Sequence, residues 1–255
     1  MKFICLPGGF GNAKTFKIQL GPFCKELERD GTASFVFTQG SFSCSPPAAY
    51  EGYFGLGPHY RFTEPSNAAV GEVLEAIREF PDAETPEEAM RALLDNMADG
   101  GLQYSNVGNA LDIIYATMDL EGDVEGIIGF SEGSMIAASV ILEEQRRFLE
   151  HGIEPRLKCA VFLSGWPPVS TTDGRFVMCD ESEEMINIPT LHVMGATDPM
   201  IPGGLTLYNM CNMDNAEMFD HGNGHLVPRE KEVLRELGQV VRNLIRNVTT
   251  SGDSP

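Results

Sequence analysis

The chain has 255 residues, and its 18 lysines and arginines against 37 aspartates and glutamates give a formal net charge of −19. This charge argues against binding to nucleic acid or to an anionic membrane surface, because it is repelled by both. The hydrophobic share, 42%, is ordinary for a soluble protein, and no run reaches the roughly 18 apolar residues of a membrane span. The length suits one large α/β domain that buries its core without metal or disulfide support.

The six cysteines are scattered along the chain, and none forms a Cys-x-x-Cys pair or a zinc-ligand spacing. We therefore expect reduced, structural thiols and no metal or other cofactor. The first apolar run, residues 3–6, is too short for the apolar region of a signal peptide. We interpret it as the first core strand of a cytoplasmic protein.

The N-terminal part predicts a strand, a loop, a helix and a second strand. Residues 2–6 form the first strand, and the glycine-rich loop 7–12 follows it. Apolar residues at helical spacing predict a helix over 13–28, which Pro22 is expected to kink or interrupt. Residues 34–38 form the second strand.

A long segment between residues 40 and 62 is rich in glycine, proline and aromatic residues. A loop of this length in a compact domain is usually a lid, a binding loop or disordered. The aromatic content makes disorder the weakest of these alternatives. We predict that residues 41–62 form a lid or a pocket loop, with Tyr53 and Phe54 among the residues that line the pocket.

The rest of the chain alternates helices and strands. The predicted helices cover residues 67–80, a segment from 86 onward, 105–120, 134–149, 203–211 and 230–248, and the predicted strands cover 124–130, 158–163, 190–194 and 217–219. This alternation predicts a mainly parallel, doubly wound sheet flanked by helices, in a single domain over residues 1–248. The polar tail, residues 249–255, is expected to fray.

The pentapeptide Gly129-Phe130-Ser131-Glu132-Gly133 lies between a predicted strand and a predicted helix. This is the context of a nucleophile elbow, in which a tight turn projects a serine hydroxyl above the sheet. The two glycines fit because a Cβ at either position would collide with the neighbouring strand or helix. We therefore predict that Ser131 is the nucleophile of an acyl-transfer reaction.

A serine nucleophile needs a general base and an orienting carboxylate, and in this fold they follow it as acid and then histidine. Asp198 comes directly after the strand 190–194, where catalytic groups are expected, and is preferred over Asp173 and Asp180. His225, preceded by a glycine-rich turn after the last strand, is the preferred base, with His221 as its rival.

Two backbone N–H groups should bind the oxyanion of the tetrahedral intermediate. We expect one from Glu132, the residue after the nucleophile, and one from Gly9 in the loop after the first strand. A glycine-rich loop that opens a helix could also bind phosphate, but the sequence contains neither a P-loop motif nor a Gly-x-Gly-x-x-Gly motif.

The motifs as a set resemble the FSH group of serine hydrolases over essentially the whole chain. They include the loop after the first strand, the stretch 19–22, the elbow, Ser164-Gly165-Trp166-Pro167, the segment around Asp198, and Gly224-His225-x-x-Pro228. The resemblance implies an α/β-hydrolase fold and a Ser-His-Asp triad. It also implies an esterase or thioesterase that releases a polyketide acyl chain from its synthase in secondary metabolism.

Three residues depart from the pattern of this family. Pro7 stands where many members have histidine, Glu132 where many have glutamine, and Trp166 where phenylalanine is usual. Glu132 places a carboxylate beside the nucleophile, although the predicted oxyanion donor at that position is the backbone. Trp166 is expected to reshape the acyl pocket.

We predict hydrolysis of a bulky acyl thioester or ester through an acyl-enzyme, with a polyketide synthase acyl carrier domain as a possible partner. Phe10, Tyr53, Phe54, Trp166 and Met200 are the expected pocket residues. Several methionines crowd the C-terminal half, namely Met185, Met194, Met200, Met210, Met213 and Met218. We expect most of them to fill the core, and any that line the site would favour a large apolar acyl group. A general carboxylesterase and a catalytically silent binding protein remain the alternatives.

Overall fold

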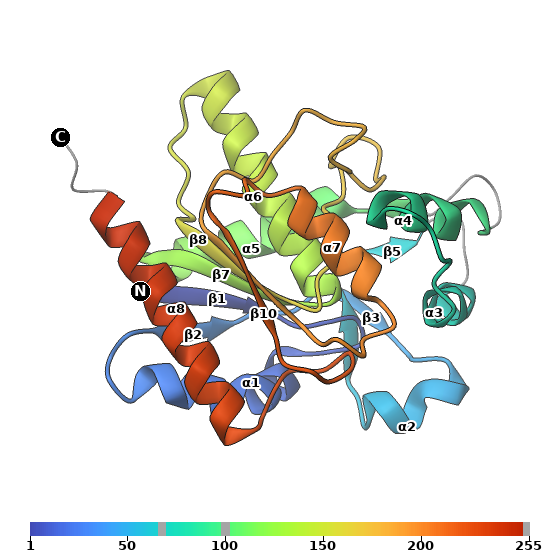
Figure 1. The fold of residues 1–255 in the computed structure, drawn as a ribbon, viewed down its shortest axis with the longest axis horizontal. Coiled ribbons are helices and arrows are strands. Elements are labelled where there is room, and N and C mark those ends of the chain that lie inside the picture. The colour runs from blue at the N-terminus through green and yellow to red at the C-terminus, as the bar shows by residue number, and fades with distance from the viewer. Residues whose placement is uncertain (66–69, 98–102, 252–255) are drawn as a thin grey trace.

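A six-stranded parallel sheet forms the centre of the computed structural model, which describes residues 1–65, 70–97 and 103–251 (Figure 1). Its strands are β1 (Lys2–Leu6), β2 (Ser34–Phe37), β7 (Val124–Phe130), β8 (Cys159–Leu163), β9 (Thr190–Met194) and β10 (Ala216–Asp220). The order across the sheet is β10-β9-β8-β7-β1-β2, and every pair is parallel. The predicted parallel sheet is confirmed.

The strand order reverses direction next to β1. The chain first steps from β1 to β2 on one side, and β7 then pairs with β1 on the other side. The carboxyl ends of β1 and β7 therefore lie side by side, where the chain leaves in opposite directions and a crevice opens. The glycine-rich loop after β1 and the elbow after β7 meet at this point.

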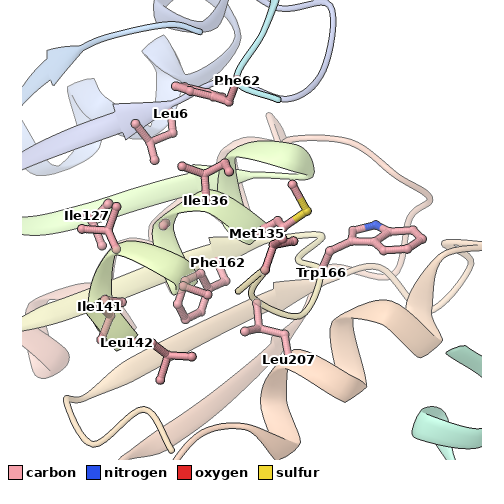
Figure 2. Packing of buried hydrophobic residues seen from close by; sticks show 14 of the residues in the cluster. Leu6, Phe62, Ile127, Met135, Ile136, Ile141, Leu142, Phe162, Trp166 and Leu207 are labelled. Atoms are coloured by element: carbon pink, nitrogen blue, oxygen red, sulfur yellow. The ribbon is translucent and has the colours of Figure 1, made fainter. Parts of the chain in front are cut away.

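Alternate residues of β1 enter two different cores, as a strand buried on both faces requires. Phe3 and Cys5 pack with apolar side chains of α1 (Ala13–Glu28) and α8 (Lys231–Ser251). Ile4 and Leu6 pack with those of α5 (Val107–Glu121) and α6 (Glu132–His151). The sheet is thus covered on both faces, and Figure 2 shows part of the core under α6, including Leu6, Ile127, Ile136 and Phe162.

Helix α1 continues through Pro22, contrary to the expected interruption. Proline cannot donate to the carbonyl four residues earlier, which belongs to Ile18. The Ile18 side chain is 60% exposed, so this side of the helix faces water, which can satisfy the freed carbonyl.

The C-terminal helices also differ from the predicted limits. Helix α7 (Ile201–Asn209) begins and ends two residues earlier than predicted. Helix α8 extends to Ser251, so the expected fray does not begin at residue 249, and residues 252–255 lie outside the described part of the chain.

The aromatic segment is built of short regular elements rather than irregular loop. Strands β3 (Phe42–Cys44) and β4 (His59–Arg61) pair antiparallel, and a 3-10 turn (Ala48–Tyr50) and helix α2 (Glu51–Phe54) lie between them. A second antiparallel pair, β5 (Glu64–Pro65) with β6 (Tyr104–Ser105), was not predicted.

Two helices follow these strands along the chain. Helix α3 (Val70–Arg78) is shorter than the predicted 67–80, of which residues 67–69 lie outside the described part. Helix α4 (Pro86–Asp95) begins at the predicted residue, and the Thr85 hydroxyl caps it by accepting a hydrogen bond from the Glu88 N–H at 3.2 Å. None of the helices in the described ranges is both long and apolar enough to cross a membrane.

A buried histidine in β9 makes stability depend on pH. His192 is 1% exposed, between the rings of Phe162 and Tyr208, and burial lowers its pKa to about 3. Below pH 6.5 His192 is therefore protonated in the unfolded chain but not in the native state, so stability falls as the pH falls. We expect protonation of His192 in the unfolded chain to lower the free energy of unfolding by up to about 2 kcal/mol between pH 6.5 and 5.

Urea unfolding of wild type and His192→Phe across this pH range tests the expectation. The difference in free energy of unfolding between the two proteins should change with pH in favour of the variant as the pH falls. A constant difference would mean that His192 does not titrate on unfolding.

Candidate active site

The strand β7 ends in the predicted sharp turn, with Ser131 at its tip. The residue has φ 53° and ψ −118°, a conformation that L-residues rarely adopt. The turn is fixed by a hydrogen bond from the Ser131 N–H to the carbonyl of Leu163 at 2.9 Å. A Cβ on Gly129 would overlap the Gly133 backbone, and one on Gly133 would overlap the Leu6 carbonyl. Both glycines are therefore required by close packing, as predicted.

Asp198 and His225 are joined directly. Asp198 Oδ2 and His225 Nδ1 are 2.8 Å apart, and Asp198 Oδ1 accepts from the Met200 N–H at 2.8 Å. Burial alone would raise the pKa of the Asp198 carboxyl, but hydrogen bonds from His225 and Met200 hold it below its usual range. The carboxylate therefore stays ionised in the folded protein. Its stabilising contribution is lost only when the pH falls through this lowered pKa.

The loops that carry Asp198 and His225 are held together independently of that pair. The Thr197 N–H donates to the Asn223 carbonyl at 3.2 Å, and the Ala196 N–H donates to Asp220 Oδ1 at 2.9 Å. Gly195 lies so close to Asn223 that a Cβ would overlap its carbonyl. The two loops after β9 and β10 thus form one hydrogen-bonded unit.

The rival candidates lie elsewhere. His221 is buried, makes no hydrogen bond to Asp198, and has a pKa lowered by burial. Asp173 accepts from the Arg175 N–H at 3.2 Å within its own turn, and Asp180 pairs with Arg91 at 2.7 Å. Of the predicted acids and bases, only Asp198 and His225 are brought together.

A cavity of about 440 Å³ opens beside Ser131 and His225, which both line it. No hydrogen bond joins their side chains here, and His225 Nε2 makes none to any described residue. Catalytic hydrogen bonds are often long before substrate binds. The five expected pocket residues all line the cavity, namely Phe10, Tyr53, Phe54, Trp166 and Met200. The Tyr53 hydroxyl also donates to the His225 carbonyl at 3.2 Å.

Gly9 and Glu132 also line the cavity next to the serine. The N–H groups of both residues make no hydrogen bond to any described part of the protein. Glu132 opens α6, where the first N–H groups of a helix have no partner within it. These two backbone groups are therefore free to bind an oxygen atom.

Sequence reasoning missed a polar group in the cavity wall. Arg61 at the end of β4 lies 3.5 Å from Glu132 Oε1 through its Nε, and both side chains are buried. Tyr104 lies beside Arg61, and burial raises the pKa of its hydroxyl to about 12. Burial alone would lower the pKa of Arg61, but Glu132 raises it. In the sequence, the only indication of this cluster was the Glu132 carboxylate next to Ser131, because a buried carboxylate needs a cation nearby.

The apolar lining differs in part from the expectation. Of the six methionines proposed, Met200 lines the cavity, whereas Met194 and Met210 are core residues and Met185, Met213 and Met218 are exposed. Met135 of α6 lines it instead, and Figure 2 shows it near Trp166 at the border of the core cluster. Helix α3 contributes Val73, Leu74 and Ile77.

The model of a known protein family, described as serine hydrolase (FSH1), matches residues 1–237. The chain belongs to this family. The resemblance seen in the motifs is thereby confirmed, and the protein is a serine hydrolase.

Known relatives and solved structures agree with this assignment. Hydrolase phiM of Talaromyces stipitatus is 26% identical over 245 residues, which cover 92% of this chain and 83% of the relative. Esterase FPY3 of Fusarium mangiferae is 20% identical, with 96% and 97% covered. The crystal structure of Arabidopsis thaliana SOBER1 has a TM-score of 0.53 at 18% identity, with 98% and 99% covered. At that identity it supports the fold alone.

Proposed function

We propose that this serine hydrolase cleaves an acyl thioester through a Ser131–His225–Asp198 triad and an acyl-enzyme. The observation that carries the proposal is the His225–Asp198 pair at 2.8 Å, on the wall of the cavity that also exposes Ser131. With Nδ1 bound to an ionised carboxylate, the ring is held in the tautomer that leaves Nε2 free to accept a proton.

In the first step His225 Nε2 takes the proton of the Ser131 hydroxyl as its oxygen attacks the acyl carbonyl. The backbone N–H groups of Gly9 and Glu132 donate to the oxyanion that forms. The proton then goes from His225 to the leaving thiolate sulfur or alkoxide oxygen. His225 Nε2 then takes a proton from a water molecule, whose oxygen attacks the carbonyl carbon of the acyl-enzyme. The bond between the acyl group and the Ser131 oxygen breaks, the acid is released, and His225 returns the proton to the serine.

The cavity and its position beside Ser131 support the proposed substrate class. Its lining is largely aromatic and aliphatic, and its volume of about 440 Å³ suits an acyl chain of the size of a polyketide. Hydrolase phiM and esterase FPY3 are fungal proteins with hydrolase and esterase names. We propose release of a polyketide acyl chain from an acyl carrier domain in the cytoplasm, a reducing compartment consistent with six free thiols.

Intact-protein mass spectrometry tests the proposal. Rapid quenching after mixing with N-acetylcysteamine thioesters of long acyl chains should reveal a mass gain of one acyl group, located by peptide mapping on Ser131. The ratio of kcat/KM for a thioester over the matching oxygen ester should exceed one. A preference for short oxygen esters would instead indicate a general carboxylesterase. Failure of a fluorophosphonate probe to label Ser131 would indicate a silent binding protein.

A further inference from the structure

One corner of the largely apolar cavity holds a buried ion pair. Arg61 from β4, Glu132 from α6 and Tyr104 from β6 all line the cavity and are at most 9% exposed. Arg61 also lies over the Phe10 ring, with its guanidinium carbon 5.8 Å from the ring centroid. A buried ion pair is costly to desolvate unless its remaining hydrogen-bonding groups are satisfied. The buried Arg61–Glu132 pair therefore needs further hydrogen-bonding groups to satisfy its free atoms.

The hydrogen-bonding capacity of this pair is incompletely used. Glu132 Oε1 accepts from the N–H and hydroxyl of Thr63, at 3.2 and 3.1 Å. Within the described part of the chain, the buried Glu132 Oε2 accepts no hydrogen bond and the buried Arg61 Nε donates none. The Arg61 guanidinium also donates a hydrogen bond to the Tyr104 hydroxyl, so Nε is its buried donor without a partner among the described residues. A free acceptor and a free donor thus lie next to one another, where buried polar groups are normally paired.

This corner is close to the reacting centre. A Cβ on Gly9 would lie 3.1 Å from Glu132 Oε2 and 3.8 Å from Arg61 Nε. A Cβ on Gly8, the preceding residue, would lie 3.2 Å from the Ser131 Cβ. The free acceptor and the free donor therefore border the loop that carries the Gly9 N–H, near the place where the first carbons of an acyl chain on Ser131 would lie.

We propose that Arg61 and Glu132 recognise a hydroxyl group on carbon 2 or 3 of the acyl chain. The inference rests on the proposed acyl-transfer function of Ser131. A hydroxyl donates to Glu132 Oε2 and accepts from the guanidinium, so it satisfies both groups at once. A carbonyl would satisfy only Arg61, and a carboxylate would be repelled by Glu132.

The test compares N-acetylcysteamine thioesters of octanoate, 2-hydroxyoctanoate and 3-hydroxyoctanoate. For the wild type, kcat/KM should be about 10- to 100-fold higher for one hydroxylated chain than for octanoate, as expected for a hydrogen bond to charged groups. In Arg61→Met this ratio should fall to near one. That substitution leaves the buried Glu132 carboxylate without a counter-ion, which destabilises the folded protein. Glu132→Gln therefore accompanies it, since its amide keeps an oxygen for Thr63 and replaces the free acceptor with a donor.

The matched control is Arg78→Met, which removes an arginine that lines the same cavity and lies over Tyr50, away from Glu132. It should leave the ratio between the hydroxylated and plain chains as in the wild type. Equal kcat/KM for all three thioesters in the wild type, or a ratio unchanged in Glu132→Gln, would overturn the inference while leaving the acyl-transfer proposal intact. No turnover of any thioester and no labelling of Ser131 would instead refute the underlying function.

Discussion

Replacing Ser131 with alanine should lower kcat for acyl-ester hydrolysis by about four to six orders of magnitude. The change removes the only atom that forms the acyl bond, while the positive φ of the elbow and the two N–H donors are set by the backbone. The cavity remains, so substrate should still bind. Steady-state kinetics with a p-nitrophenyl ester measures the loss, and equilibrium binding of a product acid measures what is retained.

The control for this substitution is Ser43→Ala, at an exposed serine of β3. It should hydrolyse the ester at the wild-type rate and still react with a fluorophosphonate, whereas Ser131→Ala should not be labelled. Near-normal turnover by Ser131→Ala would mean that the elbow serine is not the nucleophile.

Asp198→Asn should reduce kcat by about 10,000-fold with little change in KM. An amide at this position can present its N–H₂ group to His225 Nδ1, which favours the tautomer that carries the proton on Nε2. The ring then cannot accept the serine proton. Because the amide has nearly the same shape and its oxygen can still accept from the Met200 N–H, the variant should keep its fold.

Asp173→Asn provides the comparison, since that exposed carboxylate contacts only its own turn and is not part of the site. It should retain wild-type kinetics. If Asp198→Asn lost less than tenfold in kcat, the carboxylate at 2.8 Å from His225 would not be the orienting group, and another acid would have to be sought.

The sequence was sufficient to predict the sheet and to single out Ser131, Asp198 and His225 as candidates, because each depends on a local pattern. Strand β9 was predicted to the residue from its apolar run, and Asp198 and His225 were found by their positions after strands. The two elbow glycines predicted the tight turn because only a residue without a Cβ can pack at these positions.

The polar corner could not be predicted because it depends on contacts between distant segments. Arg61 reaches Glu132 only after β3 and β4 pair and turn back toward α6. Tyr104 joins them through the two-residue pairing of β5 with β6, which is too short to leave a periodic signal. Which of the methionines face the cavity could not be predicted for the same reason, since composition does not specify which side chains line a pocket.

The hydrogen bonds between the loops after β9 and β10 have a consequence for how such a protein can be altered. Because Thr197 and Ala196 are hydrogen-bonded to Asn223 and Asp220, the loops that carry Asp198 and His225 form one module, and Ser131 belongs to another. Grafting either loop alone from a relative would break the module, so recombination between homologues should keep residues 195–225 as a single block.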